Sequence, residues 1–253
     1  MLVGAHTPSQ HPLAEAEDRS ADLVQIFLSN PQSWKKPSPR EDVGELRKSP
    51  IPIYVHAPYL INLCADNNRV RIPSRKILQD TCDAASEIEA QAVVVHGGHV
   101  TGDGPQEEGI DRWRKALDSL DSNMQVLIEN TAGGDKAVAR RVDWIKRLWE
   151  EIGSYDVGFV LDTCHAWAGG EPFDGLVERV LGATGRIDLL HANDSKDPFD
   201  SRRDRHQNLG HGEIPEELLA TVIRAADAPV VVETPGSSEE QAADIEWVRA
   251  LDT

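Results

Sequence analysis

The 253-residue chain has few cysteines and few aromatic residues, and it contains no long apolar run. Cys64, Cys82 and Cys164 are too few and too scattered for a disulfide scaffold, and such usage is typical of a reduced cytosol. No apolar stretch approaches the roughly 18 residues that a membrane span requires, and the first residues lack the basic and apolar segments of a signal peptide. The sequence therefore predicts a cytoplasmic protein without a membrane partner.

Basic residues are also scarce, with 26 Lys and Arg against 43 Asp and Glu, for a net charge of −17. Proteins that bind nucleic acids usually carry a basic surface, so this composition argues mildly against DNA. Bound divalent cations, however, would reverse the local field of an acidic site. The basic residues also gather in clusters, which leaves a nucleic-acid partner open: Lys35 and Lys36; Arg69, Arg71, Arg75 and Lys76; and Arg202, Arg203 and Arg205.

Eight short aliphatic runs alternate with longer charged segments of helical spacing, such as residues 74–90 and 136–153. The near-continuous hydrophobicity of runs such as AVVV before His96 is typical of parallel strands covered on both faces. Eightfold strand–helix alternation over this length predicts an α/β fold, a (β/α)8 TIM barrel forming one domain over residues 1–253. The expected strands are residues 2–5, 22–28, 51–56, 92–96, 125–129, 157–161, 187–191 and 229–233.

Six of these runs end at a residue of a metal-ligand type. The C-terminal ends of barrel strands converge at one mouth, where the active sites of this fold lie. One such residue is most often a helix cap or a satisfied polar group, but six together would bury charges that need compensation. Divalent cations compensate them naturally, and mixed nitrogen and oxygen ligands suit zinc or manganese. The six are His56, His96, Glu129, Asp162, His191 and Glu233.

A second candidate group follows the seventh run, in SRRDRHQNLGHGE. Alternate residues of an extended segment face the same way, so Asp204 and His206 could hold one ion together. His165, three residues after Asp162, would complete a three-ligand site with a position open to substrate. The pattern predicts nine ligands, five histidines and four carboxylates.

These motifs resemble endonuclease IV, the metal-dependent family of apurinic/apyrimidinic endonucleases, over essentially the whole chain. The stretches that carry the resemblance are VGAH, NPQSW, HAPYLINL, HGGH, IENTAG, LDTCHAWAGG, HANDSK, DRHQNLGHG and VVETP. Three features depart from the family pattern: HGGH is one residue shorter than the usual HPGSH, the NPQSW loop offers Gln32 and Ser33 where an Arg is frequent, and His211 replaces a small or acidic residue.

The resemblance implies a centre of three Zn²⁺ ions, with Mn²⁺ an alternative at one or more sites. One metal would take His56, His96 and Glu129, and a second would share Glu129 and add Asp162, His191 and Glu233. The third would take His165, Asp204 and His206. Glu129, Asp162 and Glu233 are the implied catalytic residues.

The implied function is base-excision repair of double-stranded DNA. We expect a cytoplasmic monomer that associates with the nucleoid during repair. The enzyme would cut 5′ to an abasic site, leaving a 3′-hydroxyl and a 5′-deoxyribose phosphate, and would remove 3′-blocking groups. A different hypothesis is a sugar isomerase or epimerase of the xylose-isomerase-like barrels, which needs one divalent metal and fewer ligands. The candidate DNA contacts are Asn30, Gln32, Ser33, Trp34, Tyr59, Lys196 and Arg205.

Overall fold

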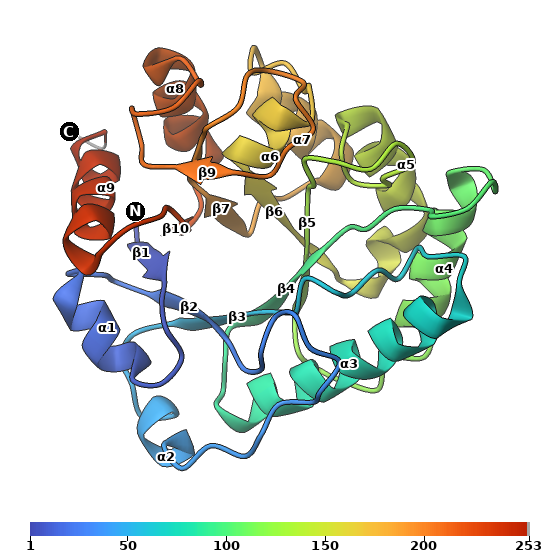
Figure 1. Ribbon diagram of the computed structural model, residues 1–253, viewed down its shortest axis with the longest axis horizontal. Helices are drawn as coiled ribbons and strands as arrows, with labels where there is room; N and C mark the ends of the chain where they lie inside the picture. The colour runs from blue at the N-terminus through green and yellow to red at the C-terminus, as the bar shows by residue number, and fades with distance from the viewer. Residues whose placement is uncertain (252–253) are drawn as a thin grey trace.

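The computed structural model describes residues 1–251 and consists of a closed ring of parallel strands surrounded by helices (Figure 1). The strand order around the ring is β1-β10-β7-β6-β5-β4-β3-β2, which confirms the predicted TIM barrel. Each expected strand is present, with ends within two residues of the predicted ones. The strands are β1 (Val3–His6), β2 (Val24–Phe27), β3 (Ile53–His56), β4 (Ala92–His96), β5 (Val126–Glu129), β6 (Gly158–Asp162), β7 (Leu189–His191) and β10 (Val230–Val232).

Helices connect successive strands around the outside of the ring (Figure 1). The connection between β6 and β7 contains two helices rather than one, because α6 stops at Ala168 and is followed by Gly169 and by Gly170, whose φ is 77°. The helices are α1 (Pro12–Asp18), α2 (Val43–Leu46), α3 (Asn68–Glu87), α4 (Glu107–Leu117), α5 (Val142–Ile152), η1 (Gly153–Tyr155), α6 (Thr163–Ala168), α7 (Leu176–Thr184), α8 (Glu216–Ala226) and α9 (Ser238–Ala250).

The helix expected over residues 136–153 begins only at Val142. The preceding backbone pairs instead with the loop after β4: the amide of Val100 donates to Lys136, and that of Val138 donates to Gly98, both at 3.1 Å. These tertiary hydrogen bonds replace the first helical turns, so the helical spacing of that segment was misleading. In contrast, α3 begins before the expected residue 74, because the side chain of Asn67 caps it by accepting from the amide of Arg69, and the helix continues through Pro73.

The strand-end ligand candidates point into the mouth of the barrel because side chains alternate in direction along each strand. Along each strand, side chains alternate between the inside of the barrel and the layer between sheet and helices. In seven strand segments, a side chain of the inner core lies two positions before a polar residue. The same alternation therefore directs that polar side chain into the mouth of the barrel. The inner side chains are Leu23, Tyr54, Val94, Leu127, Val160, Leu189 and Val231, and the polar residues are Gln25, His56, His96, Glu129, Asp162, His191 and Glu233.

A short antiparallel hairpin, β8 (Asp194–Ser195) and β9 (His206–Gln207), follows β7 and was not expected. The buried carboxylate of Asp194 holds it by accepting hydrogen bonds from the amides of Ser195, Gly212 and Ile214. The hairpin brings the 196–205 loop back over the barrel, which places Asp204 beside the strand ends. Among residues 1–251, no helix combines the length and apolarity needed to cross a bilayer.

Candidate metal centre

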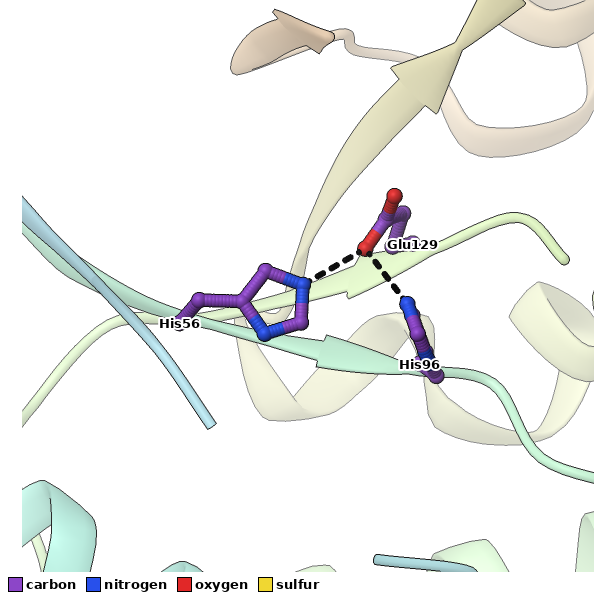
Figure 2. A group of neighbouring side chains, drawn as sticks. All are labelled: His56, His96 and Glu129. Carbon is purple, nitrogen blue, oxygen red and sulfur yellow. Dashed lines mark hydrogen bonds and ion pairs between the residues drawn. The ribbon is translucent and has the colours of Figure 1, made fainter. Parts of the chain in front are cut away.

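The first group of candidate ligands comes from three adjacent strands, β3, β4 and β5. Nε2 of His56 and Nε2 of His96 lie 3.1 and 3.3 Å from the same oxygen, Oε2 of Glu129. Figure 2 shows both rings directing a nitrogen toward that oxygen. Glu129 and His56 are buried, while His96 is partly open to the mouth. Two imidazole nitrogens and one carboxylate within 4.8 Å of one another could hold a divalent cation.

The second group shares Glu129 through its other oxygen. Oε1 of Glu129 lies 3.0 Å from Nδ1 of His191, and that nitrogen is 3.4 Å from Oε2 of Glu233 and 3.9 Å from Oδ2 of Asp162. The ligand atoms of all four residues lie within 4.8 Å of one another. The two oxygens of Glu129 therefore face different groups of candidate ligands.

The third group combines α6 with the hairpin. Oδ1 of Asp204 lies 3.1 Å from Nε2 of His165 and 3.1 Å from Nε2 of His206. Asp162 also lies within 4.8 Å of the two imidazoles, a proximity that the sequence pattern did not indicate. Cys164 is near Asp204 and His206 as well, but burial raises the pKa of its thiol to about 12, so the thiolate that a metal needs is disfavoured.

Four histidines have one ring nitrogen occupied by an acceptor of the protein. Nδ1 of His56 faces the carbonyl of Ala57 (2.7 Å), Nδ1 of His165 faces that of Asn130 (2.9 Å), and Nδ1 of His206 faces that of Glu233 (3.3 Å). Nε2 of His191 faces the amide oxygen of Gln25 at 3.0 Å. An imidazole that donates from one nitrogen presents a lone pair on the other, which is the arrangement of metal-binding histidines.

Two of the inward nitrogens provide a test of whether a cation fits. Nε2 of His165 and Nε2 of His206 are buried, and within the described residues neither forms a hydrogen bond. Oδ1 of Asp204 is close to both nitrogens, but it does not lie in the direction that a hydrogen bond from either ring requires. Buried nitrogens without a partner are costly, and a shared cation beside Asp204 would satisfy all three groups.

Electrostatics in the cluster follow from the close packing of acids and imidazoles. Burial alone would raise the pKa of Glu129, but His191, His96 and His165 hold it well below its ordinary value. Burial lowers the pKa of His191, and Glu233 and Glu129 overcome it, raising that pKa to about 9. The pKa of Asp162 is raised by burial. Without metal, protons therefore supply part of the positive charge that the carboxylates require.

Several positioning residues were missed by the sequence analysis. Gln25 donates to Glu233 (2.7 Å), and His6 lies 3.2 Å from the same oxygen. Asn193 donates to Asp162 at 2.7 Å, and its oxygen accepts from the amide of Glu233 at 2.8 Å. For His6 the signal was available, since it too ends a strand. Amide side chains are not among the usual zinc ligands, so no signal marked Gln25 or Asn193.

The centre opens to solvent through a cavity of about 340 Å³, whose lining includes Tyr59, His96, Asp204 and Pro235. The ring of Tyr59 stacks on His96 with centroids 5.9 Å apart and meets Phe27 edge to face at 5.0 Å. It remains 53% exposed, so it forms a wall of the cavity that a substrate can touch.

The other candidate DNA contacts lie outside the ligand cluster. Trp34 is 42% exposed on the loop after β2, where Asn30 accepts from the amide of Gln32 and Ser33 from that of Lys35. Lys196 is exposed, and its amide donates to the carbonyl of Arg205. The guanidinium of Arg205 forms two hydrogen bonds with Asp197, at 2.7 and 2.5 Å, so a phosphate would have to share it.

Comparison with known proteins shows which family the whole chain resembles. A family model described as "Xylose isomerase-like TIM barrel" matches residues 13–251. Proteins named "Probable endonuclease 4" from Mycobacterium marinum and Mycobacterium tuberculosis are 58% and 57% identical over 249 residues, which cover 98% of this chain and 98% of each relative.

Solved structures agree with these relatives. Endonuclease IV from Thermus thermophilus superposes with a TM-score of 0.86 at 30% identity, covering 99% of this chain and 98% of the other. A D-tagatose 3-epimerase-like protein superposes with a TM-score of 0.80 at 20% identity, covering 99% of this chain and 97% of the other, and shows the shared fold alone.

Proposed function

Because the chain belongs to the endonuclease IV family of xylose isomerase-like TIM barrels, we propose that it is a zinc-dependent DNA-repair nuclease. Its substrate is double-stranded DNA with an abasic site or a blocked 3′ end. Hydrolysis of the phosphodiester 5′ to the lesion leaves a 3′-hydroxyl and a 5′-deoxyribose phosphate. The observation that carries the proposal is the set of inward imidazole nitrogens around four carboxylates, with four of the rings oriented by an acceptor on the other nitrogen.

Three groups of side chains would hold the cations. His56 and His96 share one with Glu129; Asp162, His191 and Glu233 share a second with Glu129; and His165, Asp204 and His206 take the third. Bound metal supplies Lewis acidity and a water of lowered pKa, and it compensates phosphate charge. Zinc suits the nitrogen and oxygen ligands, and manganese is the alternative.

The protein itself fixes the geometry of those ligands. Glu129 is fully buried, and its two oxygens face two groups, so it sets the separation between them. Asn130 donates to the carbonyl of Asp162 (2.9 Å), and Asn193 holds the carboxylate of Asp162. Preorganised ligands leave little reorganisation for the moment of reaction.

Recognition of the lesion depends on the rim of the cavity. A nucleotide without a base costs less to unstack and to rotate out of the duplex. The exposed rings of Tyr59 and Trp34 support a role in entering the duplex beside it, together with Asn30, Gln32 and Ser33. Lys196 and Arg205, next to the hairpin, are the proposed phosphate contacts. We further propose that the protein acts as a cytoplasmic monomer.

The sugar-isomerase hypothesis accounts for fewer residues. The quartet of Glu129, Asp162, His191 and Glu233 could serve one metal in such an enzyme. That reaction needs neither the His165, Asp204 and His206 group nor the pair of His56 and His96, which lie at the same mouth with inward nitrogens. These additional ligands favour the nuclease.

Incision of a defined duplex tests the proposal. The zinc-loaded protein is incubated with a duplex carrying one abasic analogue, with and without a chelator, and the products are sized on a denaturing gel. We expect a cut 5′ to the lesion that disappears when metal is stripped and returns when zinc is restored. A protein with full metal content that leaves the duplex intact would contradict the proposed activity.

A further inference from the structure

A groove of about 760 Å³ lies between α5, α7 and the 196–205 loop, separate from the cavity of the metal centre. Its walls contain five basic and four acidic residues (Asp135, Asp143, Glu171 and Asp200), so the groove carries a small positive formal charge in a chain with a net charge of −17. Arg141 and Arg179 share the buried carboxylate of Glu171, which lies 3.0 Å from each. The remaining basic residues are Arg140, Arg202 and Lys146.

Arg140 has no ion pair among the residues that the structure describes. Its guanidinium donates instead to the carbonyl of Gly134 at 3.1 Å. Burial lowers the pKa of Arg140, the neighbouring cations Arg202 and Arg141 lower it further, and nearby carboxylates offset only part of this. These carboxylates leave part of the repulsion between the two guanidinium groups, and a bound anion beside both would offset it further.

The backbone presents Arg202 to this groove in an unusual conformation. Arg202 and Asp200 have φ values of 61° and 58°, a left-handed region that L-residues rarely adopt. The conformation is held because the amide of Arg202 donates to Ala168 (2.8 Å) and that of Asp200 donates to Trp167 (3.1 Å). Strained backbone of this kind persists where the surrounding structure fixes it, often beside a functional site.

Arg202 is available to a stronger ligand. It lies 2.6 Å from Asp135 and 3.8 Å from Asp200, and these carboxylates are 84% and 54% exposed. Such exposed ion pairs contribute little. A phosphate can accept two parallel hydrogen bonds from a guanidinium, a stronger and more directional interaction.

The groove adjoins one side of the metal centre. Arg202 is two residues from Asp204 along the chain. Cγ of Arg140 lies so close to Gly169 that a Cβ there would meet it at 3.0 Å, and the amide of Gly169 donates to the carbonyl of His165 at 2.7 Å. An anion in the groove would therefore lie near the segments that carry His165 and Asp204.

We propose that Arg140 and Arg202 bind a backbone phosphate of the DNA duplex flanking the cleavage site, next to the His165 and Asp204 side of the centre. This inference rests on the proposed nuclease function. The two arginines act as positioning residues, since they touch the polymer outside the reacting phosphate. They also provide local positive charge to a polyanion approaching an acidic protein.

Steady-state incision of the abasic duplex by the zinc-loaded protein tests the inference. Arg140→Gln and Arg202→Gln, combined, should raise KM about tenfold with little change in kcat, and should reduce the slope of log(kcat/KM) against log[salt] by about one for the lost phosphate contact. Arg140→Lys keeps the charge, so its KM should lie between that of the wild type and that of the double variant. Arg224→Gln is the matched control, because Arg224 lies in the last turn of α8, away from the groove. Metal content and unfolding midpoint are measured for every variant.

Methylphosphonate substitution then identifies the phosphate. Neutralising one flanking phosphate at a time should weaken the wild type at one position, and the double variant should be insensitive at that position. An unchanged KM, or equal sensitivity of both proteins along the whole duplex, overturns the inference. Inhibition of both proteins by inorganic phosphate is measured as well. If the double variant is no longer inhibited but binds the duplex as tightly as the wild type, the groove binds a free anion and the inference is overturned.

Failure of the proposed function gives a different result. If the zinc-loaded wild-type protein does not cut the duplex, the proposed function is wrong. Binding of the same labelled duplex, measured by fluorescence anisotropy, then tests the groove independently of cleavage. Weaker binding by the double variant than by Arg224→Gln would still support the phosphate contact. Equal binding by both would overturn it.

Discussion

The amide oxygen of Gln25 lies 3.0 Å from Nε2 of His191, although the two residues are 166 positions apart in the chain. The nitrogen of the same amide donates to Glu233 at 2.7 Å. One side chain that is not itself a ligand candidate therefore orients two that are. Through His191 it also fixes which imidazole nitrogen faces Glu129.

Removing this amide should weaken metal binding rather than the fold. In Gln25→Ala we expect metal affinity to fall about 10- to 100-fold, as is typical when a ligand loses its orienting partner, and activity to return with excess zinc. Competition with a fluorescent chelator measures the affinity. Gln125→Ala is the matched control, because Gln125 bonds the carbonyl of Asp156 outside the cluster. Equal affinities in the two variants would remove the orienting role of Gln25.

Glu129 is expected to be indispensable, since both of its oxygens contact histidines of different groups. Glu129→Gln removes the negative charge and one acceptor while keeping the shape, and we expect incision to drop by about a thousandfold or more. Circular dichroism should show an intact fold. Full activity in this variant would contradict the bridging role.

Asp204 is expected to control the third ion alone. It contacts His165 and His206, and neither of the first two groups includes it. Asp204→Asn should reduce the content of about three metals per chain to about two, measured by elemental analysis of dialysed protein. A wild-type content of one metal would favour the sugar isomerase over the nuclease.

The pH dependence of stability should differ between stripped and loaded protein. Burial lowers the pKa of His191 and His206, but nearby carboxylates raise each to about 9, from 6.5. A raised pKa contributes stability that is complete below 6.5 and is lost as the pH rises through about 9. The Tm of the stripped protein should therefore fall between pH 6.5 and 9.

Metal ligation requires the unprotonated imidazole, so the loaded protein should gain affinity over the same range. The difference in Tm between zinc-loaded and chelator-stripped samples should widen from about pH 6.5 to about 9. Differential scanning calorimetry at several pH values gives this difference. A stripped protein whose Tm rises across the interval would show that protons do not compensate the cluster.

Tyr59 is expected to act on DNA rather than on metal. Tyr59→Ala should raise KM for the abasic duplex about tenfold, by loss of one stacking contact, with unchanged metal content. Tyr155→Ala is the matched control, since Tyr155 is also exposed and contacts Asp118 away from the cavity. If both variants bind the duplex alike, Tyr59 serves only to pack against His96 and Phe27.

Much of the strand framework could be predicted because buried parallel strands leave continuous aliphatic runs. Val94 and His96, or Leu127 and Glu129, differ by two positions, so a residue that ends such a run points to the same side as the inner core. That local rule is enough to collect the six strand-end ligand candidates at one mouth. Helix starts were less predictable, because the conformation of residues 136–141 depends on hydrogen bonds with the loop after β4.

By itself, the sequence determined the barrel and the kinds of side chain at its mouth, since the spacing of apolar residues and the residue types are local properties of the chain. Only the tertiary structure decided which nitrogen of each imidazole faces inward, that Gln25 and Asn193 orient the acids, and that Arg140 and Arg202 line one groove. Those relationships join residues far apart along the chain. No spacing rule contains them, because they depend on how the closed ring and the β8–β9 hairpin bring distant segments into contact.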